Sequence, residues 1–455
     1  MLRRPLMQKE INELVAAGNT CDKWNNIRVA QDFTTKNIHN SKFTGKIKLH
    51  GFSGKSCAYR GVEFKTGIYN SWINESVVED ACICDVKLFS NSVACDEALV
   101  FNVGSVTCDK DMSQIKVGTE GGHRVLKRQF SENERSIIGR KSRVCNTSSL
   151  ENSHLGDFTN IENGALVRDS ILENNVTITD NAIVKSSFIG SFSHIGEAEV
   201  GNSLIGPLVQ IHHHSLLISA LWAEGRGNVG YGANVGSNHT GRMPDQEIVP
   251  GLGQFFGLGC SVKFPANFSE APFTMIATGV ICEPQRLKFP FSLLKKSGNA
   301  LNEIIPGWVY SKNVYGVFRS IYKWDKRSGN ATSLNLLFSD PLLNSVMNAC
   351  KILKEFLLGK NTLLTVATEQ ELPGLGSNFI KTENLEKIIE AYELYLLDYD
   401  FYKRNGKLNE SIISRIEENL KRDELRGQKI FDDYMDFHPR DEEFFRWLRN
   451  LMGRG

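Results

Sequence analysis

The polar segment over residues 236–255 gathers side chains that could perform group-transfer chemistry. Val235 and Phe256 both fit a repeating pattern of aliphatic residues, yet they lie 21 positions apart where the pattern needs five or six. A repeat protein that uses residues on such an excursion often builds a binding face with them. The segment offers a proton acceptor, amide donors and an anion partner: Ser237, Asn238, His239, Arg242, Asp245 and Glu247. The alternative is a surface loop whose polar side chains only face water.

Three consecutive histidines at 212–214 are the second candidate for chemistry. Alternation along a strand sends His213 to one side and its two neighbours to the other. Because Ile211 and Ser215 are expected to point inward, we expect His213 to point inward too or to lie at a bulge. Adjacent strand positions cannot readily chelate one metal ion, since their side chains diverge. A histidine that acts as general base or hydrogen-bond donor, and histidines that are only packed or exposed, both stay open.

Aliphatic residues recur every five or six positions from Ile138 to Leu217, and each group of three steps spans 16 or 17 residues. Small or β-branched residues follow most of them four positions later, as at Ser142, Ser148 and Thr159. Neither an α-helix nor a β-hairpin has this period. A triangular coil of three short parallel strands does, with the aliphatic side chains stacked inside. An all-β sandwich with strands at this spacing is the alternative, which two matching columns disfavour. The series is Ile138, Val144, Leu150, Leu155, Ile161, Val167, Leu172, Ile178, Val184, Ile189, Ile195, Val200, Ile205, Ile211 and Leu217.

Turn-forming residues lie between the predicted strands. Glycine directly follows several of the aliphatic residues, at Gly139, Gly156, Gly190, Gly196 and Gly206. Asparagine and aspartate are frequent at the turns, where a left-handed backbone is expected: Asn163, Asp169, Asn174, Asp180 and Asn181.

The pattern predicts a mainly β chain with three regions. An N-terminal capping segment is expected over 1–45, and a parallel β-helix over 46–290 with insertions near 110–137 and 236–255. Weaker coils are expected within 67–101, with Leu88, Ala94 and Val100 in step. An α-helical region is expected over 291–455, where amphipathic faces recur and Asp340-Pro341 is typical of a helix start.

Composition excludes several classes of protein. The 53 Lys and Arg residues balance 52 Asp and Glu residues, which argues against a nucleic-acid binder that depends on net charge. No apolar run is long enough to span a membrane, and the N-terminal residues do not read as a secretory signal. The ten cysteines are scattered without a CxxC pair. A cytoplasmic protein is therefore expected.

The repeat resembles the hexapeptide-repeat superfamily, whose members form a left-handed parallel β-helix. Many of them are trimeric CoA-dependent acyltransferases in which a histidine accepts a proton from the acceptor. The resemblance implies an acyl transfer to a sugar or sugar-nucleotide, with acetyl-CoA or another acyl-CoA as co-substrate and no bound cofactor. It implies His239 as first choice for the base, with His213 and His214 behind it. Substrate-binding roles fall to Asn238, Arg242, Glu224, Ser237 and Asp245.

Hexapeptide carbonic anhydrases bind zinc through three separated histidines, so His194, His214 and His239 are the set to examine for a metal. No metal is predicted. The rival to the transferase is a non-catalytic scaffold or regulatory sugar-nucleotide-binding protein, comparable to β-helix domains that assemble larger enzymes.

A narrower resemblance is carried by HHSLLISALWAEGRGNVGYGANVGSNHTGRMPDQEIVPGLGQFFG, by FPFSLL and SIYKWDKR, and by EINELVAAGNTCDKWNNIRVA near the start. These stretches are similar to an uncharacterised bacterial hexapeptide family often labelled sugar-phosphate nucleotidylyltransferase-like. That activity needs a large α/β nucleotide-binding domain opening with a Gly-rich loop. Residues 1–45 are too short for one and contain no such motif, so nucleotidylyl transfer is not expected.

Overall fold

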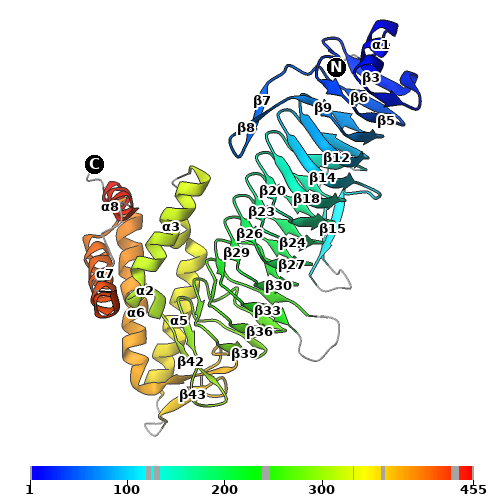
Figure 1. Cartoon of the computed structure of the whole chain (residues 1–455). Helices are drawn as coiled ribbons and strands as arrows, with labels where there is room; N and C mark the ends of the chain where they lie inside the picture. Colours follow the sequence, from blue (N-terminus) through cyan, green and yellow to red (C-terminus); the bar gives the residue numbers. More distant parts are fainter. Residues whose placement is uncertain are drawn as a thin grey trace. The chain divides into compact units, whose positions relative to one another are not determined.

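The computed structural model describes residues 3–118, 124–127, 134–237, 246–330, 333–359, 364–431 and 440–452. They form a mainly β protein, with a parallel β-solenoid of about 15 turns and a C-terminal helical region (Figure 1). The predicted fold class is therefore confirmed. The chain divides into two compact units, one of residues 1–223 with 240–247 and one of residues 224–239 with 248–455.

The coils of the first unit have three faces, and each face is a ladder of parallel strands (Figure 1). The first face contains β4 (Ile38–His39), β9 (Gly67–Tyr69), β20 (Asn160–Glu162), β23 (Thr177–Thr179), β26 (His194–Gly196) and β29 (Gln210–His212). The second contains β2 (Thr20–Cys21), β5 (Lys42–Thr44), β10 (Trp72–Asn74), β21 (Leu166–Arg168), β24 (Ile183–Lys185), β27 (Glu199–Gly201) and β30 (Leu216–Ile218). The long strands β12 (Cys82–Ser90), β14 (Leu99–Thr107) and β18 (Arg143–Glu151) run through the corner and belong to both.

The third face begins with β1 (Arg3–Pro5), which pairs antiparallel with β3 (Ile27–Ala30). Its later strands are β6 (Ile47–Leu49), β11 (Val77–Val78), β13 (Ser92–Ala94), β17 (Ser136–Ile138), β19 (His154–Leu155), β22 (Ile171–Leu172), β25 (Phe188–Ile189), β28 (Leu204–Ile205) and β31 (Leu221–Trp222). The helix α1 (Gln8–Ala16) and the 3-10 turn η1 (Trp24–Asn26) lie among the first strands.

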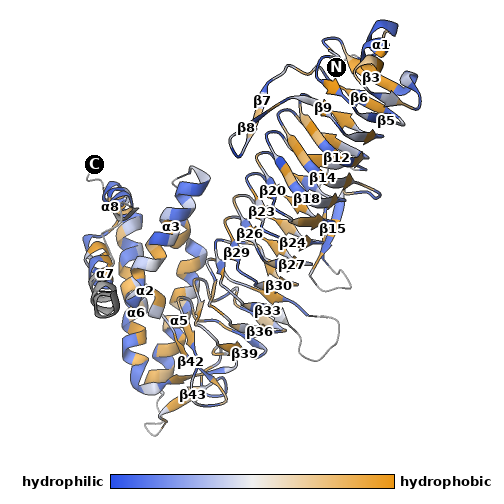
Figure 2. Cartoon of the chain, viewed as in Figure 1, coloured by the Kyte–Doolittle hydropathy of each residue, from blue (hydrophilic) through white to orange (hydrophobic). Residues whose placement is uncertain are grey.

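The predicted aliphatic column forms the interior of these coils. Every member of the series from Ile138 to Leu217 is at most 3% exposed. Like residues lie above like, as in the register of Ile178 with Ile195 and of Ile195 with Ile211. Many outward positions between them are polar, so the coil strands in Figure 2 mix hydrophobic and hydrophilic residues. Burial of this column is the main favourable contribution to the stability of the solenoid.

A ladder of buried serines runs up the corner between the second and third faces. Ser170 donates its hydroxyl to the Arg168 carbonyl at 2.7 Å and accepts the backbone N–H of Ser187 at 3.2 Å. The same two bonds recur at Ser153, Ser187 and Ser203. Each hydroxyl therefore satisfies a backbone donor of the next coil where no water reaches it.

Glycine at the corner between the third and first faces allows successive coils to approach closely. A Cβ built on Gly139 would lie 2.4 Å from the Gly156 carbonyl oxygen, and one on Gly190 would lie 2.6 Å from the backbone nitrogen of Pro207. These contacts are with backbone, which cannot move without separating the coils. The pattern of an aliphatic residue followed by glycine therefore reports a close approach of two backbones.

We expect Gly190→Ala to lower the free energy of unfolding by about 3 kcal/mol, because the added methyl overpacks a rigid corner. Gly201→Ala is the matched control, since its Cβ would lie 3.5 Å from Ile218 Cγ2, at ordinary contact distance. That variant should stay within about 0.5 kcal/mol of the wild type. Urea unfolding followed by circular dichroism measures both. Equal stability of the two alanine variants would contradict the close approach at residue 190.

Two β-hairpins leave the coils and cover apolar patches on their outside. The first is β7 (Ser56–Tyr59) with β8 (Val62–Lys65), whose Cys57 and Tyr59 pack against Cys82, Leu99 and Cys145. The second is β15 (Gln114–Val117) with β16 (Arg124–Lys127), and it is the expected insertion near 110–137. Its apolar residues pack on the third face against Ile171, with Phe188, Leu204 and Leu221 alongside. Both patches are apolar because each hairpin shields them from water.

The predicted region boundaries need correction at three points. Strands β2 to β5 already pair with later coils, so the solenoid begins within the segment 1–45 that was expected to be only a cap. The strand β41 (Leu293–Lys295) pairs in parallel with β38 (Met275–Ile276), so the coils extend past residue 290. The strand β34 (Ile248–Val249) pairs with β37 (Ala266–Asn267), so the excursion after Val235 ends before residue 248 instead of at 255.

The second unit contains the last coils. One ladder is β32 (Asn228–Val229), β35 (Phe255–Phe256), β38 and β41; another is β33 (Asn234–Ser237), β36 (Ser261–Lys263) and β39 (Ile281–Cys282). The third is β34, β37 and β40 (Gln285–Arg286). The strand β42 (Asn302–Ile305) pairs antiparallel with β41 and parallel with β44 (Asn378–Lys381), which pairs antiparallel with β43 (Val366–Thr368). This mixed extension connects the last coil to the helices.

The helices are α2 (Trp308–Lys312), α3 (Val314–Ser328), α4 (Leu334–Leu337), α5 (Asp340–Leu358), α6 (Leu385–Asn405), α7 (Glu410–Phe431) and α8 (Arg440–Asn450), with the 3-10 turn η2 (Thr382–Asn384) before α6. The expected amphipathic helices are present, and Pro341 lies in the first turn of α5. The buried face of α5 includes Ala349, Cys350 and Leu353. Leu342 and Val346 are buried, whereas Met347 is 52% exposed.

Candidate functional site

The histidines at 212–214 lie at the corner between the first and second faces of the first unit. The strand β29 ends at His212, and Ser215 points inward before β30 begins. His213 and His214 form the turn with φ values of 57° and 55°. Their backbone N–H groups donate to the carbonyls of Gly196 and Glu197, one coil earlier. Hydrogen bonds from the preceding coil therefore hold the two corner residues.

The corner exposes both turn histidines, so of the two alternatives expected for His213, inward-pointing or at a bulge, the inward one is wrong. A left-handed corner residue cannot follow the alternation of a strand, because the chain turns there from one face onto the next. His213 and His214 are both exposed to solvent. Exposure leaves the imidazole of His213 accessible to a substrate.

His213 is paired with a carboxylate from the preceding coil. Its Nδ1 lies 3.1 Å from Oε2 of Glu197, and both side chains are partly exposed. A carboxylate can only accept, so this contact requires the proton on Nδ1 and leaves the lone pair of a neutral ring on Nε2. A histidine oriented in this way by a carboxylate has the arrangement of a general base.

Two further histidines, His212 on β29 and His194 on β26, lie beside this pair on the first face. The ring centroids of His212 and His213 are 5.0 Å apart. Burial, with the nearby charges of His213 and His194, lowers the pKa of His212. The lowered pKa favours the neutral form of His212, so this ring adds no second positive charge beside His213 in that form.

Glu197 was not among the residues predicted from the sequence. A signal for it was present, because Glu197 precedes His213 by 16 residues, which is the length of one coil. Residues one coil apart at a corner stack on each other. Applying the repeat length to each polar corner residue would therefore have found the pair.

The structure only partly locates the other predicted site residues. His239, Asn238, Arg242 and Asp245 lie outside the described residues, as does the side chain of Ser237, the last residue of β33. Glu224 belongs to the second unit, where its carbonyl accepts a hydrogen bond from Arg226 Nη1 at 3.0 Å. The roles predicted for these residues remain predictions.

Glu247, at the end of the excursion, has a structural partner in the first unit. Its carboxylate accepts from Nε and Nη2 of Arg124 on β16, at 3.1 to 3.2 Å. The Glu247 carboxylate is thus already paired with an arginine of the second hairpin. The pair connects the hairpin to the end of the 236–247 segment.

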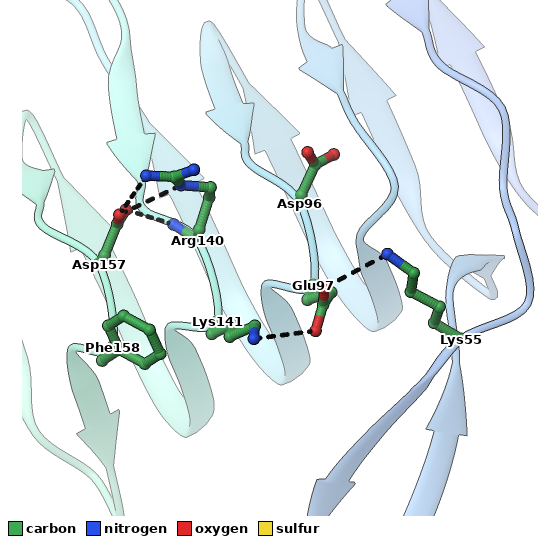
Figure 3. A pocket seen from close by; sticks show the side chains of 7 residues that line it. All are labelled: Lys55, Asp96, Glu97, Arg140, Lys141, Asp157 and Phe158. Carbon is green, nitrogen blue, oxygen red and sulfur yellow. Dashed lines mark hydrogen bonds and ion pairs between the residues drawn. The ribbon is translucent and has the colours of Figure 1, made fainter.

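A second polar site lies at the corner between the third and first faces of the first unit (Figure 3). It is a pocket of about 360 Å³ lined by Lys55, Asp96, Glu97, Arg140, Lys141, Asp157 and Phe158. Lys55 comes from the segment before β7, and the others come in pairs from three successive corners. Sequence reasoning missed this pocket, since its residues are ordinary charged turn residues in a linear reading.

Metal binding finds no support in the described part of the chain, where no group of three or more His, Cys, Asp or Glu residues could hold an ion. The zinc set of His194, His214 and His239 includes a residue outside that part. None of the described helices is both long and apolar enough to cross a membrane.

Comparisons with known proteins name no activity that can be transferred. Residues 3–126 match a family model described as a domain of unknown function, DUF4954. An uncharacterized protein of Treponema pallidum (strain Nichols) is 23% identical over 446 residues, which cover 77% of this chain and 61% of that protein. This chain therefore spans less than two thirds of the relative's length.

Among solved structures, a protein of Desulfovibrio desulfuricans G20 provisionally described as an acetyltransferase aligns at 12% identity and a TM-score of 0.19. The alignment covers 62% of this chain and 73% of that one. A TM-score this low carries no argument about fold or function. The narrower label carried by the sequence resemblance therefore remains a prediction.

Proposed function

We propose that the protein is a transferase of the hexapeptide type, which moves an acyl group from acyl-CoA to a hydroxyl or amine of a sugar or sugar-nucleotide. The pairing of His213 Nδ1 with Glu197 at 3.1 Å carries the proposal. In it, His213 is the general base and Glu197 is a positioning residue. The parallel solenoid supports it by displaying both groups on one rigid corner.

The reaction needs one proton acceptor at the attacking atom. Nε2 of His213 takes the proton from the acceptor as its oxygen or nitrogen attacks the thioester carbonyl. The resulting tetrahedral oxyanion collapses, the carbon–sulfur bond breaks, and the proton on Nε2 passes to the leaving thiolate. Glu197 stabilises the imidazolium that exists between the two proton transfers.

The corner is open, and a transfer site needs walls that exclude water. We therefore propose that a second copy of the chain faces this corner in a homo-oligomer, a trimer by the superfamily resemblance.

The test is an acetyl-CoA thiol-release assay with a panel of sugars and sugar-nucleotides. His213→Ala should lower kcat by about 10²- to 10⁴-fold with little change in KM. Glu197→Gln should lower kcat less, because the imidazolium that forms during the transfer loses its carboxylate partner. His214→Ala tests the other histidine of this corner that the sequence offers as a base; because His213 is the histidine paired with Glu197, kcat of this variant should stay close to the wild type.

Two results would count against the proposal. Unchanged activity in His213→Ala would remove the base. If no acyl transfer is seen, and neither CoA esters nor sugar-nucleotides raise the thermal midpoint, the scaffold alternative is favoured. A parallel His239→Ala variant distinguishes the base proposed here from the first choice of the sequence.

A further inference from the structure

The pocket between the third and first faces has the chemistry of a carbohydrate site. We propose that it binds a neutral pyranose ring, free or at the end of a glycan. The pocket does not depend on the proposed transfer, because it lies on a different corner from His213. Its lining combines balanced charges with one exposed aromatic side chain (Figure 3).

The charges in the pocket cancel. Lys55, Arg140 and Lys141 face three carboxylates, those of Asp96, Glu97 and Asp157. A phosphate or a metal cation would have to break existing ion pairs to bind, and no net field attracts either one. An uncharged ligand meets no such penalty.

Donors and acceptors alternate along the pocket, which suits hydroxyl groups. The Arg140–Asp157 pair is tight, at 2.8 Å from the backbone N–H and 3.0 Å from Nη2. Glu97 is held more loosely, 3.4 Å from Lys55 Nζ and 3.7 Å from Lys141 Nζ. These long contacts leave both ammonium groups able to donate to a ligand. A hydroxyl donates and accepts together, so a polyol can bridge a carboxylate and an ammonium.

Phe158 supplies the apolar surface. It is 49% exposed at the corner, with a left-handed φ of 59° set by the turn. Figure 3 shows its ring at the edge of the pocket beside Lys141. A large exposed aromatic next to polar groups suits a ligand with one apolar face and several hydroxyls, which a pyranose has. The volume of about 360 Å³ lies within the range of small-molecule sites.

The experiment is saturation-transfer NMR on the full chain with glucose, galactose, mannose and N-acetylglucosamine at millimolar concentrations. At least one sugar should show transfer to its ring C–H protons. Phe158→Ala should weaken that binding by about tenfold or more. Phe192→Ala is the matched control, since Phe192 has the same corner conformation, with φ 62°, but does not line the pocket.

Thermal midpoints of both variants establish that they fold. The proposal is overturned if no sugar shows transfer, or if Phe158→Ala binds as well as the wild type. It is also overturned if inorganic phosphate displaces the sugar, which would make this an anion site. Loss of acyl transfer in His213→Ala with sugar binding intact would separate this site from the proposed transfer site.

Discussion

Ile195→Asp is expected to unfold the first unit. Ile195 is 0% exposed and stacks in register between Ile178 and Ile211, so the variant buries a carboxylate with no partner. Burial of an unpaired charge costs several kcal/mol, and the lost aliphatic contacts add to it. We expect a loss of more than about 5 kcal/mol, which is enough to unfold a typical domain.

Two controls separate the charge from its position. Lys185→Asp places the same carboxylate at an exposed outward position on β24 of the second face, and it should change the thermal midpoint little. Ile195→Val keeps the site apolar and should cost about 1 kcal/mol. Circular dichroism during thermal and urea unfolding measures all three. A folded Ile195→Asp protein with an unchanged midpoint would contradict the stacked interior.

The interior was predictable because its signal repeats. One aliphatic residue at a spacing of five or six means little, but a series over many coils leaves one register. Where the series weakens, the prediction fails by one residue. Leu88 was expected to be in step, yet it is only partly buried, and its neighbour Phe89 on β12 is fully buried. Likewise Thr147 is buried on β18 and Ser148 is exposed. Both errors lie on long strands that run through a corner, where a step of five cannot be told from a step of six.

The candidate site was less predictable because it depends on the corners. The sequence identified the histidines by type, but the alternation rule left His213 either inside or at a bulge. Its pairing with Glu197 depends on how one coil sits above another, which the repeat length encodes only indirectly. The pocket between the third and first faces was less predictable still. Lys55 and Phe158 are about 100 residues apart in sequence, and only the stacking of coils brings them together.

Asp398→Ala is expected to have the second large effect, in the helical region. Asp398 on α6 is 1% exposed and accepts hydrogen bonds from Tyr310 Oη, at 2.8 Å, and from Arg415 Nη2 on α7. The Arg415 guanidinium lies 5.3 Å from the centroid of the Tyr310 ring. The three side chains connect α2, α6 and α7, so their loss affects the packing of three helices.

Removing the Asp398 carboxylate leaves the Arg415 guanidinium buried without the carboxylate that compensates its charge. Asp398→Ala should therefore lower the free energy of unfolding by about 3–5 kcal/mol. Asp400→Asn on the same helix is the matched control, because Asp400 pairs with Arg404 at 2.9 Å on the exposed surface. Exposed pairs contribute less than about 1 kcal/mol, so that variant should stay close to the wild type.

The double variant Asp398→Leu with Arg415→Met tests why the single one is harmful. Burial raises the pKa of Asp398 in spite of the arginine, so desolvation of this carboxylate outweighs the attraction within the pair. Replacing both charges with apolar side chains removes that desolvation cost, and the double variant should be more stable than Asp398→Ala. Urea unfolding compares the three. A double variant as unstable as Asp398→Ala would show that specific hydrogen bonds, including the one to Tyr310, hold the helices together, because the uncompensated charge would then not explain the loss.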